Sequence, residues 1–450
     1  MEGSSASCHI GDWVEDSRTH VITGDFEIAC QKVKLPWHDV WVLGARQVPI
    51  PNTRRSTAGM IVKGLGAAIA LIIGLGWLGL EWRYRRRPGN ALVTPPGQWD
   101  IKVLQDQTCR LVGQQTLINL AQGVEVMIPE LSVTATLLAK EDLSDTQVTT
   151  RVIPKHPDME ARPDGYWFAY IVKGRKATHV EIQVDIKGSG VPGLKAAWLQ
   201  IHYVTYGPKG RIPRTHHEVI PLRFPDPQVP LQWRSTPQAQ VLPVPTHLLT
   251  QLDNCVEVVK RYVLPHAQPG DIVTLGETPV AIIQGRWRHP SEIQPGWVAR
   301  RVCQFFLPTS SLATACGMQA LVDVVGPLRV LGAFIGGSIA KIFGYPGGFY
   351  QLAGEQARLI DDVTGTLPPY DQFIVLGPEN PQQVVDQIQA ETGLAAAIVD
   401  VNDLKAVKVL AATRGVSLPL LEAALQSNPA GNADEQTPVV LIRPQGSASP

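Results

Sequence analysis

The acidic run Asp400-Val401-Asn402-Asp403 holds the residue types in this chain that are best suited to chemistry. An apolar stretch at 394–399 precedes the run and predicts a β-strand, and the stretch at 404–412 after it predicts a helix. An earlier strand and a crossover helix are also predicted, so the run would lie at the carboxyl end of a strand in a βαβ unit. Ligands bind at that edge of open α/β sheets, because helix N-termini line the crevice there.

Two carboxylates and an amide in this run could bind a hard cation. Oxygen ligands suit Mg²⁺ or Mn²⁺, and such an ion could bridge Asp400, Asn402 and Asp403 to a phosphate or a carboxylate substrate. The alternative is that Asn402 or Asp403 caps the helix predicted to start at Leu404. The two interpretations are compatible, since one side chain can cap the helix while Asp400 faces the crevice.

A second acidic pair, Asp361-Asp362, follows the helix predicted at 349–360. Carboxylates at the C-terminus of a helix oppose its dipole, and this cost slightly favours a functional reason for the pair. The alternative is a solvated helix end that leads into a turn. If Asp361, Asp362, Asp400 and Asp403 share a metal ion, we expect them to lie within about 6 Å of one another.

Three other motifs could be taken for ligand sites. The glycine-rich stretch at 332–344 could bring its backbone close to a phosphate, but it lacks the Gly-Lys-Ser/Thr ending of a P-loop, and close helix packing is the alternative. Arg286, near the end of a predicted hairpin, could bind an anion or belong to a solvated basic face. His216 and His217 are adjacent in a predicted strand, so they point to opposite faces and cannot easily share one metal ion.

The length, charge balance and cysteine spacing of the chain exclude some classes of protein. The 450 residues include 40 basic and 40 acidic side chains, so the chain is long enough for two or three domains and carries no excess charge. Six cysteines form no CxxC pair, which argues against a thiolate zinc site and favours free thiols in a reducing compartment. Nothing in the sequence indicates a nucleic-acid-binding module.

Residues 60–82 are almost entirely apolar, with charges only near the two ends, at Lys63 and Glu81. As a helix, about 22 residues span roughly 33 Å, which is enough to cross a bilayer. A buried core helix and a cleaved signal peptide are the alternatives. Arginines follow at once at 83 and 85–87, so the positive-inside rule places the large C-terminal part of a single-pass membrane protein in the cytoplasm.

The rest of the chain divides by composition and periodicity. Residues 1–59 show little periodicity and predict a poorly structured extension, which would be missing if translation started at Met60. About eight short alternating stretches predict an all-β sandwich at 98–225. A proline-rich linker follows at 226–246, and 247–443 mixes strands and helices as an α/β or α+β domain, with a hairpin at 270–285.

Three blocks carry a resemblance to a known family. They read PGDIVTLGETPVAIIQGR at 269–286, FYQLAGEQARLIDDVTGTLPPYDQFIVLGP at 349–378 and AAAIVDVNDLKAVKVLAAT at 395–413. Residues 248–415 resemble the γ-glutamyl ligases that act on the precursor of the deazaflavin coenzyme F-420, and more closely a membrane-anchored branch in cyanobacteria. The β-rich part also looks like the N-terminal module of that branch.

The resemblance implies GTP-dependent joining of L-glutamate to an acid substrate through an acyl phosphate, with Mn²⁺ or Mg²⁺. It loosely implies metal ligands at Asp361, Asp362, Asp400 and Asp403. Asn402 and Arg286 are the candidate nucleotide or substrate contacts. The multidomain fold expected is therefore a transmembrane helix, a β-sandwich and an α/β ligase-like domain. Its partners would be the lipid bilayer, the nucleotide and L-glutamate.

The sequence departs from the family in two places. The central acidic motif of the ligases, which ends in Gly-Arg, is not evident between Cys316 and Phe349, and the first block also differs. Where the ligases carry a lysine-bearing run, this chain reads VTLGETPVAIIQGR, with Glu277 and no lysine. Two further hypotheses therefore stand beside the ligase-like enzyme. The chain could be a non-catalytic, membrane-tethered binding or scaffold protein that kept the fold, or the sandwich alone could carry the function by binding a partner.

Overall fold

The structure, a computed structural model, describes residues 26–34, 39–47, 57–86, 89–105, 107–362, 367–401, 406–431 and 435–445. Side chains are described from residue 66 onward, except at 67, 85, 86, 104, 361 and 362. The chain divides into two compact units, Met1–Arg87 and Pro88–Pro450.

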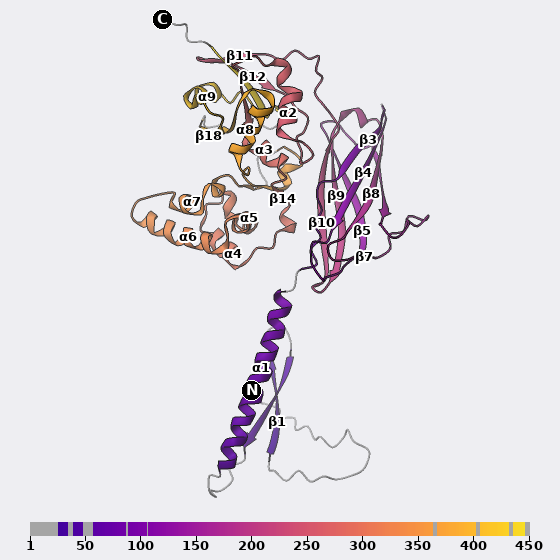
Figure 1. Cartoon of the computed structure of the whole chain (residues 1–450), viewed down its shortest axis with the longest axis vertical. Coiled ribbons are helices and arrows are strands. Elements are labelled where there is room, and N and C mark those ends of the chain that lie inside the picture. Colours follow the sequence, from indigo (N-terminus) through magenta and orange to yellow (C-terminus); the bar gives the residue numbers. More distant parts are fainter. Residues whose placement is uncertain are drawn as a thin grey trace. The chain divides into compact units, whose positions relative to one another are not determined.

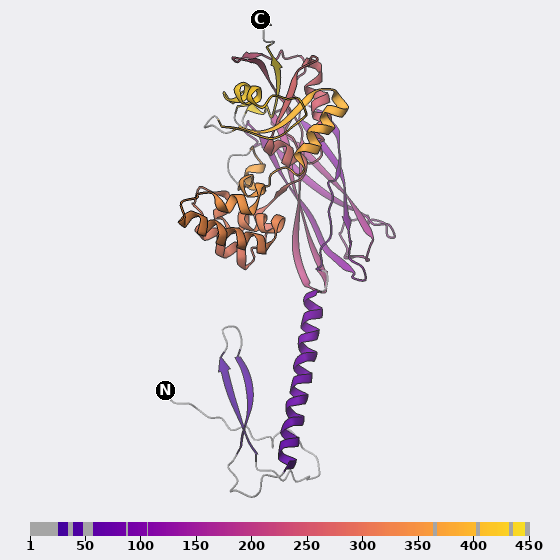
Figure 2. The same ribbon diagram turned by 60° about the vertical axis from the view of Figure 1, so that its left-hand side comes forward.

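The first unit contains a hairpin and a long helix. Strands β1 (Phe26–Lys34) and β2 (Asp39–Gln47) pair antiparallel, so the expectation of little structure before residue 60 is wrong for these residues. Helix α1 (Thr57–Arg86), the long indigo helix of Figure 2, occupies the predicted apolar stretch, and its large apolar side chains from Ile69 to Trp82 are exposed. Over the described part of the chain, no single helix combines the length and apolarity needed to cross a membrane.

The second unit begins with the predicted β-sandwich (Figure 1). Its two four-stranded sheets have the orders β3-β4-β8-β6 and β10-β9-β5-β7. The eight strands are β3 (Gln98–Gln105), β4 (Thr108–Ile118), β5 (Val126–Ala139), β6 (Gln147–Lys155), β7 (Tyr170–Val172), β8 (Ala177–Lys187), β9 (Leu194–Gly207) and β10 (Gly210–Pro221). Alternate residues of β4 and β8 are buried, as in Leu111, Ile182 and Val184, because successive side chains of a strand point to opposite faces.

A mixed six-stranded sheet, β11-β12-β19-β13-β17-β18, forms the centre of the C-terminal part. Its strands are β11 (Arg234–Ser235), β12 (Ala239–Val244), β13 (Ile272–Gly276), β17 (Ala395–Val401), β18 (Val407–Ala412) and β19 (Val439–Pro444). Ala396 and Ile398 share a core with helices α2 (Cys255–Tyr262) and α8 (Pro381–Thr392), whereas Ala397 and Val399 share one with α9 (Leu418–Leu425). Helices therefore cover both faces, which explains why the strands are apolar throughout.

A three-stranded sheet and a lobe of helices complete this part. The sheet has the order β14-β16-β15, formed by Trp287–Arg288, Ile374–Val375 and Asp361–Asp362. Figure 2 shows the lobe as a group of orange-brown helices, and we call residues 293–354 the helical lobe. It contains α4 (Trp297–Val302), α5 (Ala315–Val325), α6 (Pro327–Ile342) and α7 (Gly348–Ala353). The bent pair α5–α6, with 111° at its break, together meets the length and composition of a membrane span.

Several sequence-based expectations for this part are wrong. The stretch predicted as a helix at 404–412 contains strand β18, and the second predicted hairpin strand is helix α3 (Glu277–Ile283). The predicted linker at 226–246 includes β12, which pairs with β19 inside the sheet. β16 precedes α8 but belongs to the smaller sheet, so the predicted βαβ unit does not form, and the strand parallel to β17 is β13.

The glycine-rich stretch at 332–344 is helical rather than a phosphate loop, because most of it lies in α6. A Cβ atom on Gly337 would lie 2.5 Å from the backbone nitrogen of Phe349, and one on Gly336 would lie 2.7 Å from Leu352. These glycines let α7 approach α6 closely, which is the packing alternative considered from the sequence.

Candidate functional site

The predicted metal ligands are only partly within the described residues. Asn402 and Asp403 lie outside them, as do the side chains of Asp361 and Asp362. Asp400 lies near the end of β17, opposite Lys408 of β18. The convergence of these carboxylates therefore stays a prediction, and the helix-cap alternative is wrong because a strand follows the acidic run. Elsewhere in the described residues, no group of three or more His, Cys, Asp or Glu side chains could hold a metal ion.

A cavity of about 390 Å³ opens beside Arg286, the predicted anion-binding residue. The segments that line it are distant in the sequence: the residue before β14, the ends of α5 and α7, the start of α6, the N-terminus of α8 and β18. Its lining residues are Arg286, Val324, Val325, Arg329, Ala353, Gly354, Glu355, Gln356, Leu359, Pro378, Glu379, Asn380, Pro381 and Leu410.

The Arg286 guanidinium is fixed by three acceptors. Its Nε donates to the carbonyl of Gly377 over 2.6 Å, Nη1 to Oε2 of Glu379 over 3.2 Å and Nη2 to Oε1 of Gln356 over 3.3 Å. A guanidinium has five N–H donors, so these bonds leave two for a ligand. The side chain is 17% exposed and Glu379 is 67% exposed, so the cation is held in place while its counter-ion can move in water.

Arg329 brings a second cation to the same cavity. Its Nε donates to the carbonyl of Leu352 over 3.2 Å. Gly354, directly after α7, has a backbone φ of 103°. A Cβ atom at this position would lie 3.0 Å from Nη2 of Arg329. Glycine at this turn therefore permits both the left-handed backbone and the close approach of the guanidinium.

The N-terminus of α8 adds a partial positive charge to the cavity. Pro381 is the first helical residue, and the N-cap residue Asn380 has a left-handed backbone (φ 46°) and makes no side-chain cap. Pro381 has no N–H group, and those of Gln383 and Val384 bond to the carbonyl of Asn380, so the N–H group of Gln382 and the helix dipole are what favour an anion at this end of α8. Two guanidinium groups and a helix N-terminus together suit a phosphate or a carboxylate.

Asp400, the first residue of the acidic run, is near this cavity through the pairing of β17 with β18. Lys408, directly opposite Asp400, forms an ion pair of 3.2 Å with Glu355 of the cavity wall. Leu410, which is left unpaired where the register of β17 and β18 shifts, also lines the cavity. Asp400 is therefore on the face of the hairpin that is turned toward the cavity. Sequence reasoning selected Arg286 and Asp400 as candidates but not Arg329 or Asn380, although the predicted crossover helix begins at Pro381, directly after Asn380.

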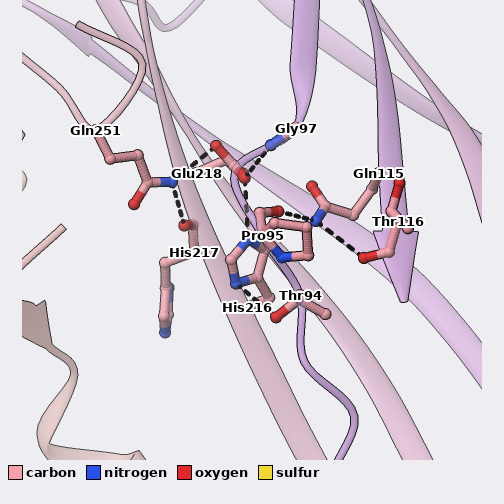
Figure 3. A network of polar contacts seen from close by, with 9 residues as sticks. All are labelled: Thr94, Pro95, Gly97, Gln115, Thr116, His216, His217, Glu218 and Gln251. Atoms are coloured by element: carbon pink, nitrogen blue, oxygen red, sulfur yellow. Dashed lines mark hydrogen bonds and ion pairs between the residues drawn. The ribbon is translucent and has the colours of Figure 1, made fainter. Parts of the chain in front are cut away.

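A different polar cluster lies inside the second unit, where the sandwich meets the C-terminal part (Figure 3). The buried carboxylate of Glu218 accepts from the backbone nitrogen of Gly97 over 2.8 Å and from Nε2 of Gln251 over 2.9 Å, and Nε2 of His216 lies 2.9 Å away. The ring of His217 points away from this carboxylate, as expected for neighbours in a strand. The expectation that the two histidines cannot share an ion agrees with this arrangement.

His217 instead packs on the C-terminal part. Its Nδ1 accepts from Nε1 of Trp198 over 3.2 Å, so the proton of the neutral ring is on Nε2, which lies 3.8 Å from Glu292. Burial lowers the pKa of His217 to about 3, with a smaller contribution from the nearby His289. Burial raises the pKa of Glu292 to about 7, against weaker opposing effects of nearby basic side chains. Both groups are therefore uncharged over much of the acidic range.

Comparisons with known proteins concern the sandwich. Residues 93–224 match the family model described as F420-0:gamma-glutamyl ligase, N-terminal Ig-like domain. The match supports the resemblance to these ligases and identifies the sandwich as Ig-like; it ends before the C-terminal part. No curated protein matches the sequence.

Three solved structures overlap with about the same share of the chain. The yeast GGA1 GAE domain is 9% identical, covering 30% of this chain and 96% of that chain with a TM-score of 0.20. The GAE domain of GGA2p from Saccharomyces cerevisiae is 9% identical. The match covers 29% of this chain and 98% of that chain, with a TM-score of 0.18. A protein from Archaeoglobus fulgidus is 10% identical. The match covers 30% of this chain and 98% of that chain, with a TM-score of 0.16. At these TM-scores the similarities carry no argument about this chain.

Proposed function

We propose that the chain is a γ-glutamyl ligase-like protein that binds the phosphate or carboxylate groups of its ligands in the Arg286 cavity. The observation that carries this proposal is the convergence of Arg286, Arg329 and the α8 N-terminus on one cavity. The family match of residues 93–224 supports the ligase family.

In this proposal the ligands are GTP, L-glutamate and an acid substrate, with Mn²⁺ or Mg²⁺ as the metal. Asp400 faces the cavity side of its hairpin, and we propose that it binds the metal together with Asp361, Asp362 and Asp403, with Asn402 beside them. A bound divalent ion would neutralise the triphosphate during phosphoryl transfer. Arg286 and Arg329 would orient phosphate oxygens. The ligand would displace the exposed carboxylate of Glu379 from its ion pair with Arg286.

Titration calorimetry on the full chain in detergent tests binding. We expect GTP to bind in the presence of Mn²⁺, and Arg329→Gln to weaken binding about tenfold, the loss of one charge-assisted contact. Arg301→Gln, at an exposed position of α4 outside the cavity lining, is the matched control. Absence of GTP and Mn²⁺ binding to a folded chain would contradict the proposal.

The alternative is a binding or scaffold protein without catalysis. It is favoured by the block that lacks the family's lysine, because this block forms helix α3 with Glu277 in its first turn. Glutamate-stimulated release of GDP distinguishes the two functions: with an acid substrate present to accept the γ-phosphoryl group, the enzyme releases GDP faster when L-glutamate is added, whereas a binding module holds GTP unchanged.

We also propose that the apolar stretch at 60–82, whose first side chains lie outside the described residues, anchors the chain in a membrane, with the large C-terminal part in the cytoplasm. The apolar stretch at 60–82 and the arginines that follow it support this proposal. Alkaline extraction of membranes that contain the full chain provides the test. An anchored chain stays in the pellet, and recovery in the supernatant would contradict the anchor.

A further inference from the structure

Residues 354–356, which follow helix α7, contact three basic side chains at the Arg286 cavity. The contacts, in chain order, are Gly354 with Arg329, Glu355 with Lys408 and Gln356 with Arg286. The three basic residues belong to α6, to β18 and to the residue before β14, so they are far apart in the sequence. This short segment therefore fixes where the cations at the cavity lie relative to one another.

Gln356 uses both ends of its side-chain amide in this arrangement. Its Oε1 accepts from Nη2 of Arg286 over 3.3 Å, and its Nε2 donates to the carbonyl of Pro378 over 3.3 Å. A carbonyl can only accept, so the nitrogen of the amide faces Pro378 and the oxygen faces Arg286. Nε of Arg286 donates to the carbonyl of Gly377 over 2.6 Å, which closes a ring of hydrogen bonds.

The backbone that carries these carbonyls is itself fixed. The N–H of Leu376 donates to the carbonyl of Arg286 over 2.8 Å. The amide of Gln284 donates to the carbonyl of Glu379 over 2.9 Å and accepts from the N–H of Glu379 over 2.7 Å. The carbonyl of residue 377 is therefore a fixed acceptor, whereas Gln356 and Glu379 hold Arg286 through their side chains, and Gln356 is the neutral one of the two.

The neutral group of Gln356 matters for the charge that is available at Arg286. A carboxylate neutralises a guanidinium, whereas an amide oxygen orients the guanidinium and leaves its positive charge for a ligand. Arginine has many rotamers, so a guanidinium that is already oriented loses less conformational entropy when a ligand binds. Gln356 therefore supplies orientation without using the charge.

We propose that Gln356 is a positioning residue of this cavity: it orients Arg286 toward an anionic ligand and leaves the charge of the guanidinium for that ligand. The inference rests on the proposed function, because it takes Arg286 as a ligand-binding residue. Gln356→Glu keeps the shape and the acceptor but adds a second carboxylate to Arg286, beside that of Glu379. Gln356→Met keeps the length and removes the acceptor. A purely structural role predicts that the glutamate is tolerated, whereas the positioning role predicts that both substitutions weaken ligand binding.

Titration calorimetry on the full chain in detergent measures binding of two probes, GTP with Mn²⁺ and inorganic pyrophosphate without metal. We expect Gln356→Glu to weaken the binding of both probes about tenfold, because a carboxylate then competes for the guanidinium. Gln356→Met should weaken binding about threefold, because the guanidinium keeps its charge but loses its fixed orientation. Binding to Gln356→Glu should also depend less on salt than binding to the wild type, because the ligand then replaces one ion pair by another.

The matched control is Gln351→Glu, which makes the same charge change at an exposed position of α7 outside the cavity lining and should leave binding unchanged. A second control is the Arg286→Gln background, in which Gln356→Glu should have no further effect, since Gln356 acts through Arg286. Urea unfolding confirms that each variant is folded.

The two probes separate this inference from the proposed function. If the wild type binds both probes and the Gln356 variants bind them equally well, the positioning role is overturned and the proposed function stands. Weakening by Gln356→Glu that persists in the Arg286→Gln background also overturns it, because the added charge would then act without Arg286. Pyrophosphate binding with the expected pattern but without GTP binding would support the positioning role and contradict the proposed function. A folded wild type that binds neither probe would overturn both.

Discussion

The junction between the sandwich and the C-terminal part differs from the Arg286 cavity in how its polar groups are used. At the junction, Trp198 and Val219 of the sandwich share a core with Trp287, Tyr370 and Phe373. Next to this core the carboxylate of Glu218 is fully buried and bonded to protein donors. At the cavity, by contrast, the counter-ions Glu379 and Glu355 are more than 60% exposed.

The difference teaches that a cluster of titratable residues is not by itself a site. The sequence His216-His217-Glu218 has ligand chemistry, yet its groups tie two parts of the chain together. The cavity has fewer such residues, but its cations keep donors toward solvent and its counter-ions can be displaced. Accessibility and spare donors, rather than residue types, separate a binding site from a structural network.

The largest expected effect is at the apolar centre of the junction. Phe373 is fully buried and its ring lies 4.7 Å from that of Trp287 and 5.5 Å from that of Trp198. We expect Phe373→Ala to lower the free energy of unfolding by about 3–5 kcal/mol, because it removes a large buried side chain and leaves a cavity. Urea unfolding followed by tryptophan fluorescence measures it. A loss below about 1 kcal/mol would mean that the junction does not stabilise the fold.

A somewhat smaller effect is expected from the buried carboxylate. Glu218→Ala would leave the donors of Gly97 and Gln251 without their acceptor, and we expect a loss of about 3 kcal/mol in the same unfolding assay. Glu218→Gln is the matched control, since it keeps the volume and one acceptor oxygen and should cost less. Equal stability of Glu218→Ala and the wild type would argue that water replaces the carboxylate.

The junction also predicts a pH dependence. The folded pKa of His217 is about 3 against an ordinary 6.5, so the unfolded chain takes up this proton first and stability falls as the pH decreases through that interval. Glu292 opposes this, because its folded pKa of about 7 lies above its ordinary 4.5 and protonation between these values favours the folded chain. The effects of His217 and Glu292 on stability offset each other above about pH 4.5. The loss of stability is therefore concentrated below this pH.

The measurement is the urea midpoint across the acidic range. The slope due to His217 is at most about 1.4 kcal/mol per pH unit. His217→Gln should flatten the decline below pH 4.5, whereas His179→Gln, at an exposed position, should not change it. An unchanged decline in His217→Gln would assign the acid sensitivity to other groups, such as His156, whose pKa burial lowers to about 4.

The sandwich and α8 were predictable because their signals are local. Alternation marks the strands, and α8 (Pro381–Thr392) is the crossover helix predicted from the sequence. The stretches at 279–283 and 407–412 were not predictable, because short apolar runs fit a helix or a strand equally well and burial decides between them. β18 contains lysine and alanine, which favour helices, but its pairing with β17 overrides that preference. Arg286 was found as a basic residue near a turn, whereas Arg329 reaches the same cavity only through the packing of α6 and α7.

The smallest predicted effect on stability, and the sharpest test of the comparison, is at the cavity. Arg329→Gln removes a cation with one bond to a backbone carbonyl, so we expect a change in the free energy of unfolding within about 0.5 kcal/mol. The same variant should weaken GTP binding about tenfold, while Phe373→Ala should weaken it only as far as it unfolds the chain. If Arg329→Gln instead destabilised the fold as strongly as Glu218→Ala and left GTP binding unchanged, the cavity would be a structural network like the junction. A binding defect without a stability defect is the result that distinguishes a site from a junction, since a ligand group contributes only when the ligand is bound.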